Sequence, residues 1–478
     1  MVVCDDHTLT FAAARDRSTA LAKALLQLGV NRGTRVGLLY PNGPAFVVAF
    51  LAAARIGAVA VPISTFSTGH ELVGLLRNAD VSTLLATPSY RSNDFAATIA
   101  SELPDWPRWS TRVPSLRHVS FDADSLDGAA VADEVLDAAE AAVSPADPLV
   151  VVHTSGSTSE PKGVVHLHGS LLDHIGHLNE LRRYSSDEIL FSNSPFFWIG
   201  GFAYSLLSTL VAGGTLICSN SPDAAGVLDV IERERPTMVN GFAAAVAHLA
   251  NDASFASRDL SSIERGNLWP IMPTQVRPRD PELRHGMLGM TEAGSVCLAS
   301  DDDTDQPESR RGSFGRPVEG FEAEIRDGVL WLRSRRLLDG YLGRERHETF
   351  DAEGWFCTGD MFHTDDDGFF YFEGRAGDLI KTAGANVSPR EVESAILDVV
   401  GLVAHVAGIE DAQRGQRVAA LVRSETSLDV EEIKKALRTR LSAYKVPDTI
   451  KVVPDHDVPM TSGGKVDLRA LKDMLSEA

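Results

Sequence analysis

Short apolar, β-branched runs alternate with longer apolar helical patterns over the first 220 residues of the chain. TALAKALLQLGV at 19–30 has the periodicity of an amphipathic helix, whereas RVGLLY at 35–40, LVVVHTS at 149–155 and GGTLICSN at 213–220 have the length and composition of buried strands. Strands that alternate with helices form parallel sheets, because each crossover helix returns the chain to the same end of the sheet. The pattern predicts an α/β fold with parallel-rich sheets covered by helices.

The size and charge of the chain narrow the classes of partner. With 478 residues, more than one domain is expected. Hydrophobic residues make up 44% and charged residues 23%, as in an ordinary folded protein. The formal net charge of -21 argues against a nucleic-acid partner or an anionic membrane surface.

The sequence gives no sign of export or membrane insertion. It has no signal-peptide pattern and no apolar run long enough to cross a bilayer. Its four cysteines, Cys4, Cys218, Cys297 and Cys357, lie far apart and lack metal-ligand spacing. Because so few cysteines are typical of a reducing compartment, we expect a cytoplasmic protein.

The pattern changes twice in the second half of the chain. Residues 321–375 alternate with turn signals as antiparallel hairpins do, which predicts a small barrel-like β part. After residue 375, PREVESAILDV and VEEIKKALRTRLS predict helices, and VAHVAGIE and QRVAALVRS predict strands. We therefore expect a large N-terminal domain over 1–376 and a small α+β domain over 377–478. The Ala- and Asp-rich stretch 121–148 is expected to be a surface linker.

The stretch VVHTSGSTSEPKGVVHLH at 151–168 sets hydroxyl residues and glycines around Lys162, directly after a predicted strand. Backbone N–H groups, hydroxyls and a lysine in such a loop can cradle phosphate oxygens. The loop differs from G-x-x-x-x-G-K-[ST], because its hydroxyls precede the lysine and a glycine follows it. On its own, the stretch is equally compatible with a flexible turn.

Five further motifs follow in order. They are NSPFFWIGG at 193–201, LGMTEAG at 288–294, GWFCTGD at 354–360, GRAGDLIKTAGANVSPREVE at 374–393 and PMTSGGKVDL at 459–468. With the first loop, they closely resemble the adenylate-forming superfamily of acyl-CoA ligases, luciferases and peptide-synthetase adenylation domains, over nearly the whole chain. The resemblance implies two steps: a carboxylate attacks the α-phosphate of ATP to give an acyl-adenylate, and a thiol then displaces AMP. It also implies that the small domain swings between these steps.

The resemblance implies a role for each matching residue. The pyrophosphate would be held by Thr154, Ser155, Gly156, Ser157, Thr158 and Lys162. In the GMTE motif, Gly289 would line the nucleotide site, Thr291 would contact the α-phosphate and Glu292 would hold Mg²⁺.

The remaining assignments concern the ribose, the carboxylate and CoA. Asp360 and Arg375 would bind the ribose hydroxyls, and Lys465 would reach the attacking carboxylate and the α-phosphate. Gly384 would line the pantetheine tunnel, and Gly377 would lie at the hinge between the domains. The alternatives are a surface ion pair for Asp360 and Arg375 and a solvated loop position for Lys465.

The sequence departs from the family pattern around the adenine and the outer phosphates. Asn267, Leu268 and Trp269 stand where the family has small residues or proline, and large side chains in a packed slot exclude a ligand. Leu288 replaces the aromatic residue that commonly stacks on adenine, and Ser159 stands where the family has glycine. Four prolines between residues 270 and 281 rule out the helix that normally follows. These departures predict that adenylation is weak or lost.

The segment PFFWIGG suggests the substrate. Trp198, Gly200 and Gly201 are expected to bind it, and the apolar surroundings favour a bulky hydrophobic acid. The segment resembles ligases for alicyclic and terpenoid acids. With the altered adenine region, it resembles acyl-CoA ligases of diterpenoid antibiotic pathways such as that of platensimycin. Fatty acids and aryl acids stay open, and so does a role of Trp198 in core packing alone.

Together these features predict an acyl-CoA ligase that makes a thioester from CoA and a hydrophobic acid. Its bound nucleotide would be AMP or the acyl-adenylate, and a separate adenylating enzyme would supply that adenylate. The use of ATP and Mg²⁺ stays open. The alternatives are a complete two-step ATP-dependent synthetase, a domain that loads a carrier protein, and a non-catalytic protein that binds an acid or a nucleotide.

Overall fold

The computed structural model describes residues 1–107, 109–154, 161–375, 379–460 and 466–476 of the chain. By its internal contacts the chain divides into two compact units. The first consists of Met1–Thr65, Leu75–His153 and Gly163–Gly374; the second consists of Phe66–Gly74, Thr154–Lys162 and Arg375–Ala478. The sequence did not suggest that two short segments from the first half of the chain group with the C-terminal part.

The first unit contains a seven-stranded sheet with the order β20-β10-β9-β4-β3-β5-β8. Its strands are β3 (Arg35–Leu39), β4 (Val59–Pro62), β5 (Thr83–Ala86), β8 (His118–Ser120), β9 (Pro148–Thr154), β10 (Lys162–Leu167) and β20 (Gly340–Tyr341). The pairs β3–β4, β3–β5, β4–β9 and β5–β8 are parallel, and β10–β20 is antiparallel. The predicted strands at 35–40 and 149–155 are confirmed.

A six-stranded sheet lies in the same unit, with the order β14-β13-β11-β12-β1-β2. Its strands are β1 (Val2–Cys4), β2 (His7–Leu9), β11 (Ile189–Phe191), β12 (Thr215–Cys218), β13 (Met238–Val239) and β14 (Arg265–Gly266). All of its pairs are parallel except the hairpin β1–β2. The expectation of parallel-rich sheets is therefore confirmed for both sheets.

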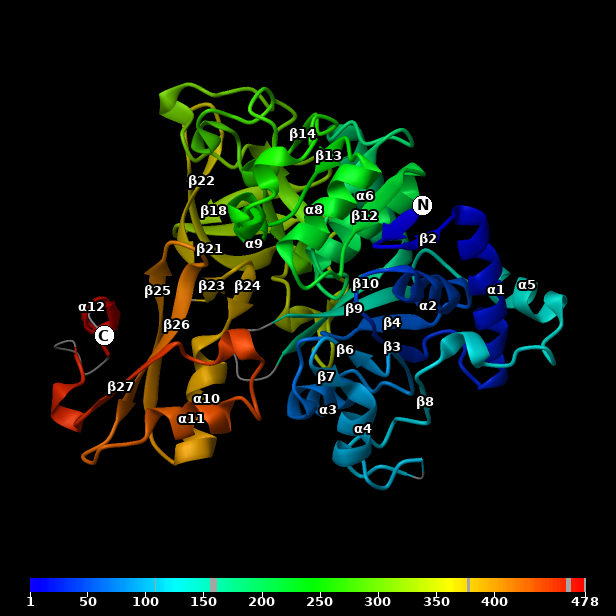
Figure 1. Ribbon diagram of the computed structural model, residues 1–478, viewed down its shortest axis with the longest axis horizontal. Coiled ribbons are helices and arrows are strands. Elements are labelled where there is room, and N and C mark those ends of the chain that lie inside the picture. Colours follow the sequence, from blue (N-terminus) through cyan, green and yellow to red (C-terminus); the bar gives the residue numbers. More distant parts are fainter. Residues whose placement is uncertain (108, 155–160, 376–378, 461–465, 477–478) are drawn as a thin grey trace. The chain divides into compact units, whose positions relative to one another are not determined.

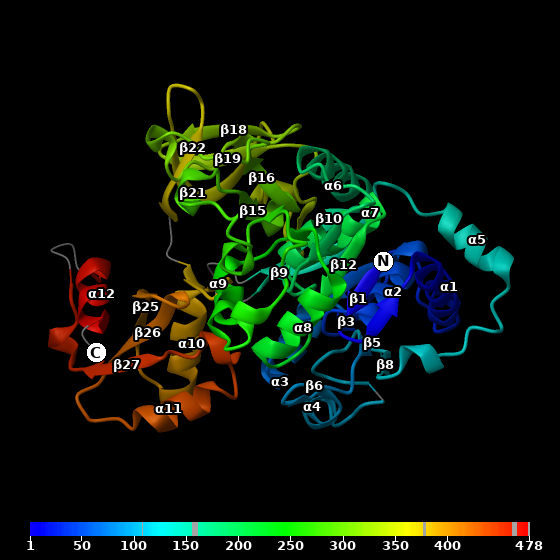
Figure 2. The ribbon, with the colours of Figure 1, turned by 45° about the horizontal axis from the view of Figure 1, so that its top comes forward.

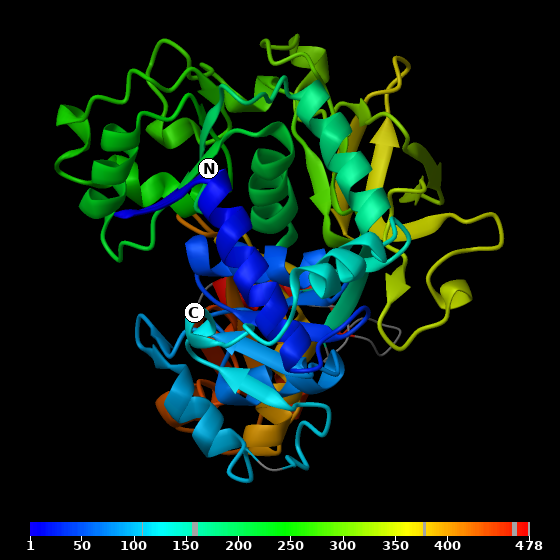
Figure 3. The same ribbon diagram turned by 90° about the vertical axis from the view of Figure 1, so that its right-hand side faces the viewer.

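Helices cover these sheets (Figure 1). In this unit they are α1 (Phe11–Gln27), α2 (Pro44–Arg55), α4 (Phe95–Glu102), α5 (Asp133–Ala141), α6 (His168–Leu181), α7 (Ser208–Ala212), α8 (Ala224–Glu234) and α9 (Ala243–Val246), while α3 (Gly69–Asn78) spans both units. Figure 3 shows α1, in dark blue, running along the surface of this unit. The stretch 121–148, expected to be a surface linker, is mostly exposed and contains α5, of which only Leu136 is buried.

An aromatic cluster joins α2 to the π-helix η2 (Gly200–Leu207). Phe46 meets Phe196 edge to face at 5.4 Å between ring centroids, and Phe50 meets Phe202 at 4.9 Å. Phe46, Phe196 and Phe202 are fully buried. Each such ring stabilises the fold by about 1.5–3 kcal/mol through burial alone, so η2 is held firmly in place.

The antiparallel part of the first unit consists of two small sheets, β15-β16-β17 and β18-β19-β21-β22. The strands are β15 (Leu288–Met290), β16 (Ser295–Ala299), β17 (Arg316–Pro317), β18 (Glu322–Arg326), β19 (Val329–Arg333), β21 (Phe356–Thr364) and β22 (Phe370–Arg375). A short hairpin of β6 (Ser89–Tyr90) and β7 (Asn93–Asp94) lies elsewhere in the unit. The predicted antiparallel hairpins over 321–375 are confirmed.

The second unit is built on one sheet with helices on both faces (Figure 2). Its elements are β23 (Ile380–Thr382), β24 (Ala385–Val387), α10 (Pro389–Val400), β25 (Ala404–Asp411), β26 (Gly415–Arg423), α11 (Val430–Leu437), β27 (Thr449–Val453) and α12 (Leu468–Ser476). Along β26, Val418 and Ala420 pack with residues of α10 and α11, whereas Ala419 and Leu421 pack with Leu471 of α12. This alternation follows from the two-residue period of a strand and explains why residues 418–422 of β26 are all apolar.

Candidate active site

The GMTE motif forms a tight turn between two antiparallel strands. Thr291 and Glu292 lie on the 3₁₀ turn η7 (Thr291–Ala293), between β15 and β16. Gly294 closes the turn at φ 72°, and a Cβ there would lie 2.8 Å from Leu171 Cδ1. Only glycine fits this combination of backbone angle and packing. Both candidate side chains are half-buried.

Neighbouring side chains hold this turn by hydrogen bonds. The Tyr341 hydroxyl donates to Glu292 Oε1 at 2.9 Å. His166 Nε2 lies 2.7 Å from the Thr291 carbonyl oxygen. Because a carbonyl only accepts, the imidazole carries its proton on Nε2 and donates it. The turn is thus fixed from two sides without using the Thr291 hydroxyl.

His166 supports the GMTE turn through a contact that the sequence did not suggest. It is fully buried on β10, and burial lowers its pKa to about 4. It therefore stays neutral near pH 7 and keeps donating to Thr291. The two residues lie 125 positions apart in sequence, so only the fold reveals the contact.

Asp360 lies in the same antiparallel part of the molecule. It is 8% exposed on β21, and its backbone N–H donates to Thr358 Oγ1 at 3.0 Å. Burial raises the pKa of the Cys297 thiol to about 12, and the charge of Asp360 raises it further. That influence places the Asp360 carboxylate near β16, the strand that follows Glu292. A surface position for Asp360 is thereby excluded.

The segment expected to bind the acyl group leads into the π-helix η2. Trp198 is half-buried, and its ring centroid lies 5.4 Å from that of Phe197. Gly201 is required by packing, since a Cβ there would lie 2.1 Å from the Pro195 carbonyl oxygen. Gly200 instead faces open space, because a Cβ added there would have no neighbour within 4 Å. π-Helical turns are rare and often occur at functional sites.

Contacts link this segment to the GMTE turn. The helix η2 packs against β16. The Tyr204 hydroxyl, on η2, donates to Met287 Sδ at 3.1 Å, directly before β15. The fold thus brings the predicted acyl segment and the predicted phosphate and metal residues to the same strands.

The altered turn near the expected adenine position is tied into the protein. The Asn267 side chain accepts from the Gly241 N–H and donates to the Gly241 carbonyl, each at 3.0 Å. Leu268 is 1% exposed in a core cluster, and Trp269 packs against that cluster while staying half-buried. Gly266, at φ 136°, lies so close to Val239 that no Cβ fits. Leu288, at the start of β15, is half-buried.

The proline-rich stretch after this turn has the expected form. Between residues 269 and 286 the chain makes only the 3₁₀ turns Trp269–Ile271 and Pro281–Leu283. The prediction that no ordinary helix forms there is confirmed.

Several candidates lie at or beyond the edges of the described residues. Thr154 ends β9 and Lys162 begins β10. Arg375 ends β22, and its side chain is outside the described part. The other predicted residues outside it are Ser155, Gly156, Ser157, Thr158, Ser159, Gly377 and Lys465.

Gly384 lies in the hairpin turn between β23 and β24. Thr382 pairs with Ala385, and the two residues between them, Ala383 and Gly384, have φ of 48° and 86°. Two consecutive positive φ values are typical of a type I′ turn, which favours glycine. A larger residue at 384 would therefore be strained.

The described residues contain neither a metal-binding cluster nor a membrane-spanning helix. Across these ranges no group of three His, Cys, Asp or Glu side chains is arranged to hold a metal ion. Glu292 fits Mg²⁺ in the way this ion usually binds, through one carboxylate together with substrate phosphates and water. No helix in the described part combines the length and apolarity that a membrane span requires.

Comparison with known proteins identifies the class. Residues 1–342 match the AMP-binding enzyme family and residues 391–465 match the AMP-binding enzyme C-terminal domain. A feruloyl-CoA synthase from an Amycolatopsis species is 31% identical, over 96% of this chain and 92% of its own. The 3-[(3aS,4S,7aS)-7a-methyl-1,5-dioxo-octahydro-1H-inden-4-yl]propanoyl:CoA ligase of Mycobacterium tuberculosis is 29% identical, over 99% and 95%.

Solved structures agree on the fold. Amide bond synthetase McbA from Marinactinospora thermotolerans superposes with a TM-score of 0.81 at 25% identity, covering 99% of this chain and 96% of that one. A double mutant of o-succinylbenzoate CoA synthetase (MenE) from Bacillus subtilis gives 0.80 at 24% identity, over 100% and 95%.

The chain therefore belongs to the AMP-binding, adenylate-forming enzymes. Within that superfamily it is an acyl-CoA ligase of the AMP-forming type.

Proposed function

We propose that this ligase joins a bulky hydrophobic carboxylic acid to CoA, and that transfer from a supplied acyl-adenylate dominates over its own adenylation by ATP. The observation that carries the proposal is the turn at 266–269. There the Asn267 amide is bound to Gly241 and Leu268 is buried, so Trp269 is held where the family has a small residue or proline. A half-buried indole at that place narrows the slot that adenine would enter.

The residues proposed for the α-phosphate, metal and ribose are retained. Thr291 and Glu292 lie on a turn fixed by His166 and Tyr341, and Asp360 is buried near β16. Fixed donors and charges stabilise a transition state best because they need no rearrangement during the reaction. On this proposal the Thr291 hydroxyl donates to the α-phosphate of the bound adenylate, and Asp360 accepts from the ribose. Mg²⁺, held by Glu292, would neutralise phosphate charge during adenylation.

Lys465 and Gly384 complete the proposed chemistry. Lys465 would stabilise the charge that develops when the carboxylate attacks the α-phosphate. After adenylation, the CoA thiol attacks the acyl carbonyl, the new C–S bond forms and AMP leaves. Gly384, in its tight turn, would let the pantetheine chain pass close to the backbone.

For the substrate we propose a ring-containing acid, with a polycyclic terpenoid acid as the leading candidate. Supporting observations are the aromatic pair Phe197–Trp198 in this segment and the open space beside Gly200. The two relatives described above are named for acids with ring systems. Medium-chain ligases are also among the relatives, so straight-chain acids belong in the test.

The test separates the two half-reactions of the purified full chain. In one arm, ATP, Mg²⁺ and a panel of polycyclic, aryl and medium-chain acids are supplied, and pyrophosphate is measured. In the other, the corresponding synthetic acyl-adenylates and CoA are supplied, and thioester is measured. We expect thioester formation at an ordinary rate and pyrophosphate release that is far slower.

The other outcomes favour the alternatives. Equal rates would show a complete ATP-dependent synthetase, which the retained Thr291 and Glu292 also support. Transfer to a phosphopantetheinyl carrier protein in preference to CoA would show a carrier-loading enzyme. If the variants Lys465→Ala and Gly384→Trp both kept full activity in the two half-reactions, the roles assigned to Lys465 and Gly384 would be contradicted.

A further inference from the structure

The seven-stranded sheet contains a topological switch point away from the candidate active site. After β3, the chain forms β4 on one side of it and then returns to form β5 on the other side. Both pairings are parallel. In open α/β sheets, ligands bind at the carboxyl ends of the strands where the strand order reverses in this way. That position here is the gap beyond the ends of β3 and β5.

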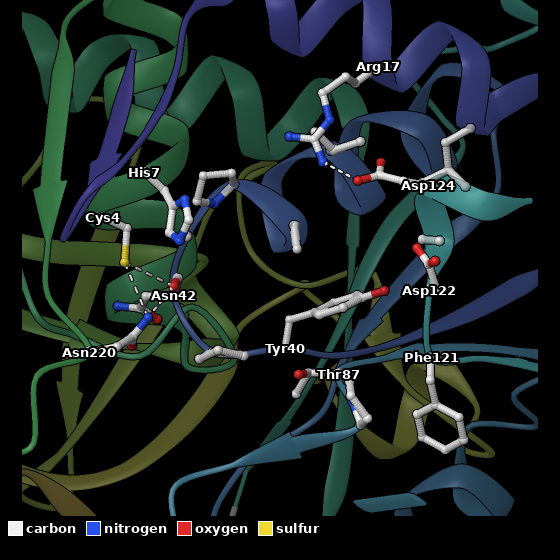
Figure 4. Close-up of a pocket in the computed structure, with 18 of the residues that line it drawn as sticks. Cys4, His7, Arg17, Tyr40, Asn42, Thr87, Phe121, Asp122, Asp124 and Asn220 are labelled. Atoms are coloured by element: carbon white, nitrogen blue, oxygen red, sulfur yellow. Dashed lines mark hydrogen bonds and ion pairs between the residues drawn. The ribbon is translucent and has the colours of Figure 1, made fainter.

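A cavity of about 330 Å³ occupies this position (Figure 4). Four of the lining residues lie directly beyond strand ends: Tyr40 follows β3, Thr87 follows β5, and Phe121 and Asp122 follow β8. The lining also includes Asp5, His7 and Arg17, besides Asn220 and the first turn of α2. None of the residues that line the cavity is among the candidate catalytic or nucleotide residues.

Tyr40 points into the cavity with an unsatisfied hydroxyl. The residue is only 5% exposed, and its hydroxyl has no hydrogen-bond partner within the described part of the chain. In Figure 4 the hydroxyl points towards Asp122. The hydroxyl faces the cavity without a partner among the described residues, so it can both donate a hydrogen bond to a ligand there and accept one from it.

Two exposed carboxylates, Asp122 and Asp124, lie at this end of the cavity, and Arg17 beside them offsets one of the two negative charges. Burial raises the pKa of Tyr40, and the charges of Asp124 and Asp122 raise it further, which places both carboxylates near the phenol. Arg17 Nη2, on α1, lies 2.7 Å from Asp124 Oδ2 and fixes this wall. Carboxylates beside an aromatic ring and a phenol oxygen suit an ammonium group.

The other end of the cavity offers backbone donors. The helix α2 begins after Gly43, whose position has no side-chain cap; Gly43, Pro44 and Ala45 line the cavity, and of these only Gly43 and Ala45 carry an N–H. N–H groups in a first helical turn have no partner within the helix. They suit an oxygen that accepts hydrogen bonds, such as a hydroxyl or an amide carbonyl.

We propose that this cavity binds a small amino alcohol or a related organic cation, with its ammonium group at Tyr40, Asp122 and Asp124 and an oxygen at the first turn of α2. The cavity is at the small end of the range for ligand sites, as a molecule of this size requires.

Asn42 connects the cavity to the acyl segment. Its Nδ2 donates to the Ser194 carbonyl at 3.0 Å, and its Oδ1 accepts from the Phe196 N–H at 2.8 Å. Asn220 donates to the Asn42 carbonyl at 2.8 Å. The segment 194–196 leads directly to Trp198. An occupied cavity would therefore change the affinity for the acid, a consequence that rests on the proposed role of Trp198, whereas binding itself does not.

The binding test uses calorimetry on the full chain with 4-aminobutan-1-ol as the probe. Butane-1,4-diol is the uncharged control of equal length, and inorganic phosphate tests the opposite charge. We expect saturable binding of the amino alcohol alone. A dissociation constant weaker than about 1 mM for the amino alcohol, or tighter binding of either control, would overturn the proposal.

Variants locate the site. Tyr40→Phe keeps the ring and should fold, while weakening binding roughly tenfold through loss of a hydrogen bond to a charged group. Asp122→Asn with Asp124→Asn should abolish binding. Asp301→Asn with Asp303→Asn, at two exposed acids outside the cavity, is the matched control for the effect of net charge. Equal weakening by this control would show non-specific attraction to an acidic protein instead.

The link to the acyl segment is tested separately. With thioester formation from a supplied adenylate as the readout, saturating 4-aminobutan-1-ol should shift the KM for the adenylate several-fold in the wild type and not in the variant Asp122→Asn with Asp124→Asn. Binding without this shift overturns the link and leaves the cation site standing. The half-reaction rates without the amine test the proposed function independently.

Discussion

Two turns at strand ends of the first unit are rigid for opposite reasons. In the turn at 266–269, the substituted side chains themselves supply the rigidity, through the Asn267 amide bonds to Gly241 and the burial of Leu268. In the turn at 291–294, neighbours supply it, through His166 and Tyr341. The turn at 291–294 commits one Glu292 carboxylate oxygen to Tyr341 and leaves its other carboxylate oxygen and the Thr291 hydroxyl for a ligand. The turn at 266–269 commits both ends of its Asn267 amide to Gly241, and this contrast underlies the proposed loss of adenylation with retention of thioester formation.

The largest expected effect is on the turn at 291–294, which His166 and Tyr341 hold in place. Glu292→Gln removes the carboxylate proposed to hold Mg²⁺, so the residual pyrophosphate release should fall by roughly 10²–10³-fold, the size seen when one charge-stabilising group is lost. Thioester formation from a supplied adenylate should change far less. Glu319→Gln, at a carboxylate with 82% side-chain exposure, is the control. Equal loss in both half-reactions would mean that Glu292 serves the fold and not the metal.

The next largest effect is the loss of folding stability at low pH, where His166 takes up a proton on unfolding. Burial holds the pKa of His166 at about 4, against an ordinary value near 6.5. The unfolded chain therefore binds a proton first as the pH falls, and stability is lost progressively from about pH 6.5 down to pH 4. At pH 5 this amounts to about 2 kcal/mol for His166 alone.

Urea unfolding at pH 7 and pH 5 checks this prediction. Burial also lowers the pKa of His153 to about 4 and that of His174 to about 3, so the wild type should lose more than His166 contributes. His166→Gln should show a smaller difference between the two pH values. His347→Gln, at an exposed position, should match the wild type. A wild type equally stable at both values would contradict the buried neutral imidazole.

The turn at 266–269, which its own side chains hold in place, is tested by removing the indole of Trp269. Trp269→Ala should open the proposed adenine slot and raise ATP-dependent pyrophosphate release by roughly tenfold, while thioester formation stays near its wild-type rate. Some stability will be lost, because Trp269 packs against a core cluster. Trp109→Ala, at a position with 70% exposure, controls for the loss of a tryptophan. Unchanged pyrophosphate release would break the comparison between the two turns.

The smallest effect is expected on the CoA side. Gly384→Ala adds a methyl group at φ 86°, and should slow thioester formation several-fold through obstruction of the pantetheine chain. Gly401→Ala is a matched control, since Gly401 also has a positive φ, of 71°, in the same unit, with open space around it. Both variants should lose about 1 kcal/mol of stability from strain. A rate loss shared by both would point to strain alone.

The sequence was sufficient for the architecture, because periodicity and turn residues act locally. The strands at 35–40 and 149–155, the antiparallel hairpins after 321 and the two C-terminal helices all formed where expected. The prolines between 270 and 281 excluded a helix, as their missing N–H groups require.

The contacts that hold the candidate site in place could not be predicted from the sequence. His166 meets Thr291 and Tyr341 meets Glu292 only because β10, β20 and the GMTE turn come together in the fold. The direction of Leu268 into the core and the π-helical form of 200–207 also depend on packing with distant residues. The roles of Ser155, Ser157, Thr158 and Lys465 stay predictions, because these residues lie outside the described ranges.

The π-helix at Gly200–Leu207 has a consequence for how this enzyme family can diversify. Such a turn accommodates one residue more than an α-helix of the same length. Deleting a single residue there would restore α-helical winding over the same length, so the flanking segments would keep their direction while side chains within the turn would change position. The wall beside Trp198 can thus be reshaped by a change in chain length, without any substitution in the wall itself.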